Sequence, residues 1–291
     1  MFLKNLIYNT YVLNDKNLFE TLISNSENHC RDSNFYINSE KKLKLELKEI
    51  KDEFYLGEIG KIHFPYFAMG NINSLDLFGL DELILFSFYF SNRSNFKNVL
   101  DLGANIGLHS LVMKKLGFTV TSYEPDPIHT SQFKKVMNLN GFDDLGLRER
   151  AISDKFGNLD FIRILGNTTG SFLAGSKENS YGPINRFSVE VDDIYTVLKD
   201  GDFDFIKMDV EGHEATLLER IPNNLLEGLK IMLEIGSEKN AKEIFRILID
   251  RKIPAYSQKS NWKRVQSLFD LPAHHSQGSL LISLSGPPTW R

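Results

Sequence analysis

The chain has 291 residues, of which 42% are hydrophobic, enough to bury one sizeable core. Its formal net charge of −4 leaves no global basic field to hold a phosphate backbone, so we expect no nucleic-acid partner. A single cysteine, Cys30, excludes an intrachain disulfide framework and a zinc cluster of cysteines, and it fits a reducing cytoplasm.

We expect no signal peptide in the first residues of the sequence. Lys4 and Asn5 interrupt the apolar residues there, so a signal-peptide core is absent. No run reaches the roughly 18 apolar residues of a membrane-spanning helix. We therefore predict a soluble cytoplasmic protein without membrane insertion.

Residues 1–75 are predicted to form a small β-rich extension ahead of a catalytic domain at 76–291. Leucines alternate with charged residues within 40–52, which is typical of a strand with one buried face. The segments 54–58 and 61–67 have the composition of further short strands.

A strongly apolar helix is predicted over 76–90, with Asp76 as its N-cap. Its apolar residues are more typical of a core than of a binding site. Glu82 is the polar residue on this helix that we expect to face a ligand, and we assign it to the acceptor site.

The segment 98–125 predicts a βαβ unit, in which a short apolar strand enters a glycine loop, a helix follows, and a second strand ends in an acid. Gly103 and Gly107 allow the loop to press its backbone against a ligand. Glu124 ends the second strand about 20 residues after the first glycine, the spacing of an acid that binds both hydroxyls of a ribose. A cofactor that contains a nucleoside is implied.

The residues between the two glycines decide which cofactor is expected. Asn105 stands where a dinucleotide fingerprint has the glycine that admits a pyrophosphate. Asp101, at the end of the strand, would pair well with an ammonium group. The loop therefore favours a nucleoside that carries a cationic amino acid over a diphosphate, the alternative being an ordinary βα turn without a ligand.

The next segments continue the α/β alternation. A helix is predicted over 126–141, capped by Asp126 with a proline at its first position, and a third strand over 147–151. Ile152 and Ser153 follow that strand and are expected to flank the adenine. Strands at 158–164 and 187–191 surround a polar loop that either contacts the acceptor or is a solvated turn.

Four later segments complete the predicted sheet: 203–209, 229–235, 254–257 and 278–284, of which the last two would pair antiparallel. The predicted fold class is α/β, a Rossmann-like doubly wound seven-stranded sheet, mostly parallel with one antiparallel strand.

Three motifs carry a resemblance to a known family: residues 101–107 (DLGANIG), 123–127 (YEPDP) and 206–214 (IKMDVEGHE). In this order they resemble the FkbM family of S-adenosylmethionine-dependent methyltransferases, and the resemblance covers roughly 76–284. It implies S-adenosyl-L-methionine as cofactor, a helix at 76–90 beside the cofactor mouth, and a hairpin insertion after the third strand.

Parallel strands bring their carboxyl ends to one rim of the sheet, where ligands bind. Five carboxylates are expected there: Asp101, Glu124, Asp209, Glu211 and Glu234. Crowded carboxylates repel one another, so the rim requires a sulfonium, a lysine, a metal ion or a proton. Lys207 shares a strand face with Asp209 and is a candidate.

Catalysis is assigned to Asp209, Glu211 and His213, with the two acids positioning the acceptor or cofactor (Asp209 in both roles). His213 has the unperturbed pKa of a base near neutrality. An equal alternative is a surface histidine at the start of a helix.

The acceptor site is predicted to include Glu234 and, at the tip of the last hairpin, His274 and His275. Asp209 and Glu234 also resemble the oxygen ligands of metal-dependent catechol O-methyltransferases. Oxygen ligands alone would hold magnesium, calcium or manganese rather than zinc, and magnesium or manganese is the expected metal if one is present.

The sequence thus predicts a methyltransferase, most simply an O-methyltransferase of a sugar or another hydroxylated small molecule, so the expected partner is a small-molecule or glycan acceptor. The alternatives are a binding module for a nucleoside cofactor that lost turnover, and a nicotinamide oxidoreductase, which Asn105 disfavours.

Overall fold

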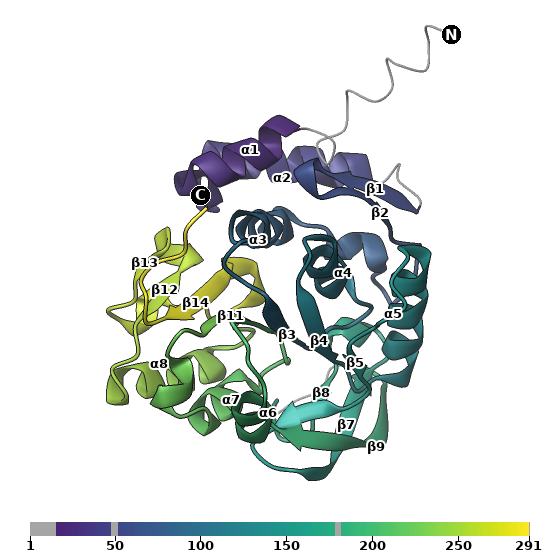
Figure 1. The fold of residues 1–291 in the computed structure, drawn as a ribbon, viewed down its shortest axis with the longest axis vertical. Helices are drawn as coiled ribbons and strands as arrows, with labels where there is room; N and C mark the ends of the chain where they lie inside the picture. Colours follow the sequence, from purple (N-terminus) through teal and green to yellow (C-terminus); the bar gives the residue numbers. More distant parts are fainter. Residues whose placement is uncertain (1–15, 48–51, 178–181, 291) are drawn as a thin grey trace, which may run out of the picture.

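The computed structural model describes residues 16–47, 52–177 and 182–290, and it is built around an eight-stranded sheet (Figure 1). The strand order is β13-β12-β14-β11-β10-β3-β4-β5. The strands are β3 (Asn98–Leu102), β4 (Thr119–Tyr123), β5 (Leu147–Arg148), β10 (Phe205–Met208), β11 (Lys230–Glu234), β12 (Ala255–Ser257), β13 (Lys263–Arg264) and β14 (Ser279–Ser283).

The predicted seven-stranded, mostly parallel sheet is confirmed, and a two-residue strand is added to it. Strands β11, β10, β3, β4 and β5 are parallel, and β14 pairs antiparallel with both β11 and β12. The extra strand β13 forms because Asn261 and Trp262 both have a φ of 57°, which turns the chain back along β12.

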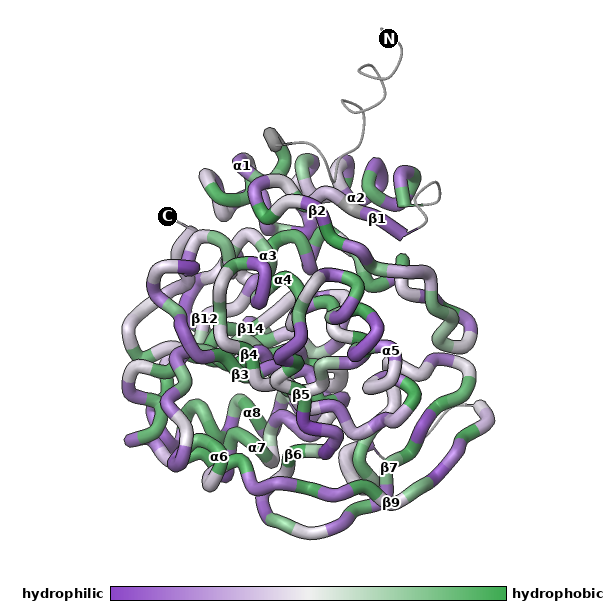
Figure 2. Tube along the Cα trace, turned by 45° about the vertical axis from the view of Figure 1, so that its right-hand side comes forward, coloured by the Kyte–Doolittle hydropathy of each residue, from purple (hydrophilic) through white to green (hydrophobic). Residues whose placement is uncertain are grey.

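Helices cover both faces of this sheet (Figure 1). One face carries α3 (Leu80–Ser91), α4 (Leu108–Lys115) and α5 (Pro127–Leu139), and the other carries α6 (Ile194–Asp200), α7 (Glu214–Arg220) and α8 (Glu238–Asp250). Hydrophobic residues gather around the central strands (Figure 2). Burial on both faces accounts for the continuous apolar runs of these strands.

The helix predicted over 76–90 is interrupted. Asp76 belongs to a capping box with Asn73 on the short helix η4 (Ser74–Leu77), and α3 begins only after Gly79. The other 3₁₀ helices are η2 (Ser26–His29), η3 (Gly57–Ile59), η5 (Thr168–Gly170), η6 (Asn223–Leu226), η7 (Gln258–Ser260), η8 (Leu268–Asp270) and η9 (His275–Gln277).

The N-terminal segment packs on α3 and is only partly β structure (Figure 1). It contains α1 (Lys16–Ser24), α2 (Asn34–Leu47) and a hairpin of β1 (Glu53–Leu56) and β2 (Gly60–His63). The predicted strand near residues 40–52 is wrong as far as Leu47, and residues 1–15 and 48–51 lie outside the described part. Leu43 and Leu47 are buried while Leu45 is exposed, because leucines four residues apart share a helix face. The domain boundary at residue 75 stays a prediction.

A second sheet of order β6-β9-β7-β8 stands beside the carboxyl ends of the first. It consists of β6 (Ala151–Ser153), β7 (Gly157–Ile164), β8 (Phe172–Leu173) and β9 (Ile184–Asp193). The two strands of the expected hairpin, β7 and β9, pair antiparallel, and the short β8 lies between them in the chain and pairs with β7. The third strand predicted at 147–151 is split, because a bend at Arg150 sends β5 to the main sheet and β6 to this one.

Within the described ranges, no helix combines the length and the apolar character needed to cross a membrane. The cytoplasmic location stays a prediction.

Candidate active site

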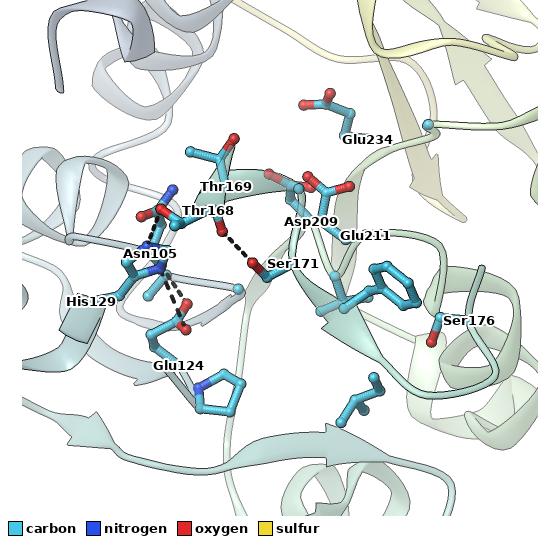
Figure 3. Close-up of a pocket in the computed structure, with 18 of the residues that line it drawn as sticks. Asn105, Glu124, His129, Thr168, Thr169, Ser171, Ser176, Asp209, Glu211 and Glu234 are labelled. Atoms are coloured by element: carbon cyan, nitrogen blue, oxygen red, sulfur yellow. Dashed lines mark hydrogen bonds and ion pairs between the residues drawn. The ribbon is translucent and has the colours of Figure 1, made fainter. Parts of the chain in front are cut away.

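A cavity of about 700 Å³ opens at the carboxyl ends of β3, β4, β10 and β11. The segment 167–177 of the second sheet forms another wall, and the Thr168 N–H at its start donates to the Met69 carbonyl. In Figure 3, Asn105, Glu124 and His129 lie on one side of this cavity and Asp209, Glu211 and Glu234 on the other.

The backbone of the glycine loop packs closely against the end of β10. Gly103 has a φ of 76°, and a Cβ there would lie 1.8 Å from the carbonyl oxygen of Asp209. Only glycine permits this approach. Gly107 is needed for packing instead, since a Cβ would lie 2.7 Å from the Phe133 ring, and it does not line the cavity.

Glu124 is buried but borders the cavity, as expected of a ribose ligand. Its two carboxylate oxygens accept the backbone N–H groups of Asn105 and Asp126, each at 2.8 Å. Burial, with repulsion from Asp126, raises the pKa of Glu124 to about 8 although these N–H groups oppose the shift. Asn105 has a φ of 52°, an uncommon left-handed conformation that points its N–H at this acid.

The two residues expected beside the adenine differ in position. Ile152 lines the cavity with an apolar side chain. Ser153 does not line it, and its hydroxyl lies 2.8 Å from His213 Nε2.

Asp101, the residue predicted to pair with a cofactor ammonium, lies beneath the cavity rather than in its wall. It is fully buried, accepts a hydrogen bond from Ser110, and has Lys207 Nζ 3.6 Å from its other oxygen. Lys207 also donates to the Gly103 carbonyl at 3.1 Å and lies 3.6 Å from Asp209. A buried lysine is thus one of the cations that the acidic rim requires.

The acidic wall of the cavity contains Asp209, Glu211 and Glu234, and also Glu82 from α3. Burial, with repulsion from Asp209, raises the pKa of Glu211 to about 7 even though Lys177 pairs with it. Burial and the neighbouring carboxylates raise the pKa of Glu234 well above its ordinary value. Glu211 has a φ of 55°, and such uncommon conformations cluster at functional sites.

The predicted histidines lie at different distances from the cavity. His275 lines it, whereas the His274 ring is tilted against the His275 ring with centroids 3.8 Å apart and lies outside the wall. His213 also lies outside, with Nε2 near Ser153 and Nδ1 3.0 Å from the Ser176 hydroxyl. Burial lowers the pKa of His213. Its two ring nitrogens therefore hold the second sheet against the start of α7.

The residues proposed as metal ligands already have a cation beside them. Lys207 lies 3.6 Å from Asp209, and among the described residues no three or more His, Cys, Asp or Glu side chains form a metal-binding group. The magnesium or manganese alternative thus has no support from the donor set.

Several polar residues of the wall were not singled out from the sequence, among them His109, His129 and Lys177. His129 Nε2 lies 2.9 Å from the Thr168 hydroxyl and so joins α5 to the loop of the second sheet. His109 occupies the first turn of the helix that follows the glycine loop, a position that could have been recognised. Lys177 follows a loop whose fold the sequence did not predict.

Three buried acids are expected to make the ligand-free protein less stable as the pH rises from about 6.5 to about 8. Burial raises the pKa to about 8 for Glu124 and to about 7 for Glu211 and Glu214, against an ordinary value of 4.5. Between the two values the folded state holds more protons than the unfolded chain, so the free energy of unfolding falls with pH. Burial lowers the pKa values of His29 and His129 to about 4. These histidines make the free energy of unfolding rise with pH, but only below about pH 6.5.

The measurement is the thermal unfolding midpoint across this pH range, where each kcal/mol corresponds to ~2–4 °C. Glu214→Gln should flatten the slope, since it removes one of the titrating groups. A midpoint that rises between pH 6.5 and 8 would contradict the assignment.

Comparison with known protein families identifies the segment of the chain that contains most of these residues. The family profile described as the methyltransferase FkbM domain matches residues 101–255, more than half of the chain. None of the curated proteins compared with the chain matches it.

Solved structures resemble the chain only distantly. Ribosomal protein L11 methylase from Lactobacillus delbrueckii subsp. bulgaricus is 13% identical, with 68% of this chain and 74% of that one covered and a TM-score of 0.37. The bifunctional kinase-methyltransferase WbdD is 15% identical, with 70% and 39% covered and a TM-score of 0.39. The METTL16 methyltransferase domain is 12% identical, with 70% and 66% covered and a TM-score of 0.40.

The profile match runs from Asp101 through the glycine loop, Glu124 and the Asp209 turn to β12, and so includes the elements that form most of the cavity wall. The chain belongs to the FkbM family of methyltransferases.

Proposed function

We propose that the protein transfers a methyl group from S-adenosyl-L-methionine to a hydroxyl group of a sugar or another hydroxylated small molecule. The observation that carries the proposal is a single cavity with two chemically different ends. One end has Glu124 and Asn105, and the other has Asp209, Glu211 and Glu234, as Figure 3 shows.

The first end fits a nucleoside. Each oxygen of Glu124 accepts one backbone N–H, which leaves acceptor capacity for the two hydroxyls of a ribose. Ile152 offers an apolar surface to the base. When bound, S-adenosyl-L-methionine would supply a methyl group activated by a sulfonium, so the protein must position the acceptor and remove its proton.

The acidic end fits a hydroxylated acceptor, because carboxylates accept hydrogen bonds from hydroxyl groups. We assign proton removal to Glu211, since its pKa of about 7 suits a base near neutrality. Asp209 and Glu234 would orient other hydroxyls. His213 would then have a structural role, because it contacts Ser153 and Ser176 beside the cavity wall. It would not contact the acceptor.

Calorimetry tests the cofactor assignment against the alternatives. S-adenosylhomocysteine should bind measurably and NAD should not, because Asn105 replaces the glycine that admits a pyrophosphate. Preferential binding of NAD would overturn the assignment in favour of an oxidoreductase.

A panel of sugars and glycans then tests turnover, measured as release of S-adenosylhomocysteine from S-adenosyl-L-methionine. Binding without release on any hydroxylated acceptor would favour the non-catalytic module.

A further inference from the structure

A chain of polar side chains connects α3 with α4 beside the glycine loop. Glu82 Oε2 lies 2.7 Å from His109 Nε2, and His109 Nδ1 lies 3.0 Å from the Tyr89 hydroxyl. Tyr89 is fully buried, and burial together with Asp101 keeps its pKa well above the ordinary value, so it stays neutral. Glu82 and His109 line the cavity.

Only one oxygen of the Glu82 carboxylate contacts His109. Its Oε2 atom is shielded from solvent beside His109, while the side chain as a whole keeps 27% of its surface exposed. Burial would raise the pKa of Glu82, but His109 and Lys207 outweigh it and lower the pKa. The Glu82 carboxylate therefore favours its ionised form, keeps part of its surface exposed, and is held next to the glycine loop.

The amino-acid part of the proposed methyl donor carries an ammonium group that needs such an acceptor. Asp101 is fully buried under Lys207, and the Gly103 carbonyl also accepts from Lys207. Asp209 has Lys207 beside it, and Glu234 has a strongly raised pKa. Of these four acids, Glu82 lines the cavity with a partly exposed side chain and a lowered pKa, and none of the described lysines lies within ion-pair distance of it.

We propose that Glu82 binds the amino group of the methyl donor, and that His109 and Tyr89 are positioning residues that hold the Glu82 carboxylate toward the glycine loop. The proposal rests on the proposed function, and it moves Glu82 from the acceptor site to the donor site. It extends the donor site to α3, outside the segment 101–255 that matches the family profile.

Three ligands that share one nucleoside test the proposal by calorimetry. S-adenosylhomocysteine has the amino and carboxylate groups, S-adenosyl-3-thiopropylamine keeps only the amino group, and 5′-methylthioadenosine lacks both. Glu82→Gln should weaken the first two at least tenfold and leave the third within about twofold, because a charge-assisted hydrogen bond contributes ~1.5–3 kcal/mol.

Tyr89→Phe separates positioning from packing, since it keeps the ring and removes only the hydroxyl that contacts His109. It should weaken the two amino-containing ligands severalfold and spare 5′-methylthioadenosine. Glu219→Gln, at an exposed ion pair with Arg246, is the matched control and should change nothing.

The outcomes are distinct. If the wild-type protein binds none of the three ligands, the proposed function fails. If it binds them and Glu82→Gln changes none, or weakens all three equally, the inference about Glu82 is wrong while the cofactor assignment stands. Selective loss of the amino-containing ligands in Asp209→Asn, with Glu82→Gln unchanged, would give the role to Asp209.

Discussion

Glu211→Gln is expected to lower turnover by ~10²–10⁴-fold, the usual contribution of a positioned general base. Glu211 lines the acidic end of the cavity, and burial raises its pKa to about 7. Glutamine keeps the shape of the side chain but cannot take the proton of a hydroxyl group. The measurement is release of S-adenosylhomocysteine with an acceptor found in the panel.

Affinity for S-adenosylhomocysteine should stay within about twofold in Glu211→Gln, since the loss concerns proton transfer rather than cofactor binding. The exposed Glu219→Gln is the matched control. His213→Asn should cost less than tenfold, because His213 contacts two serines outside the cavity. If His213→Asn instead removes activity while Glu211→Gln retains it, the proton acceptor has been assigned to the wrong residue.

Glu124→Ala is expected to weaken S-adenosylhomocysteine binding at least tenfold. The substitution removes the carboxylate that would accept both ribose hydroxyls, each a charge-assisted hydrogen bond of ~1.5–3 kcal/mol. Glu149→Ala is the matched control, because Glu149 is an exposed acid that pairs with Lys134 near the end of β5.

The pH dependence separates the ribose contact from a structural loss. Hydroxyl donors favour the ionised form of Glu124, whose pKa is raised to about 8 by burial. Affinity of the wild-type protein should therefore rise as the pH approaches 8, and the rise should vanish in Glu124→Ala. An Ala variant that is well folded and binds S-adenosylhomocysteine normally would show that this acid does not contact the ribose.

Sequence reasoning was most accurate where the signal is local. The run from Asn98 to Glu124 contains a strand, a glycine turn, a helix and a second strand, and each depends on neighbours within a few residues. Parallel strands also place their last residues on one rim of the sheet, independently of the conformation of the loops. The prediction of Glu124, Asp209, Glu211 and Glu234 around one site followed from that geometry.

Local patterns failed where they fit two periods. Leu43, Leu45 and Leu47 alternate as in a strand, yet Leu43 and Leu47 also share a helix face, and packing on α3 selects the helix. Three leucines at alternate positions are therefore not enough to distinguish a strand from a helix.

The sequence by itself determined the family, the succession of the main-sheet strands along the chain and the acids that end them, because these depend on short-range periodicity and motif spacing. Only the tertiary structure decided which polar groups reach the cavity. Lys207 and Ser110 hold Asp101 beneath the floor, two serines hold His213 outside the wall, and His109 meets Glu82 from another helix. Each of these contacts joins residues from different elements, so their distances depend on how the helices and the two sheets pack.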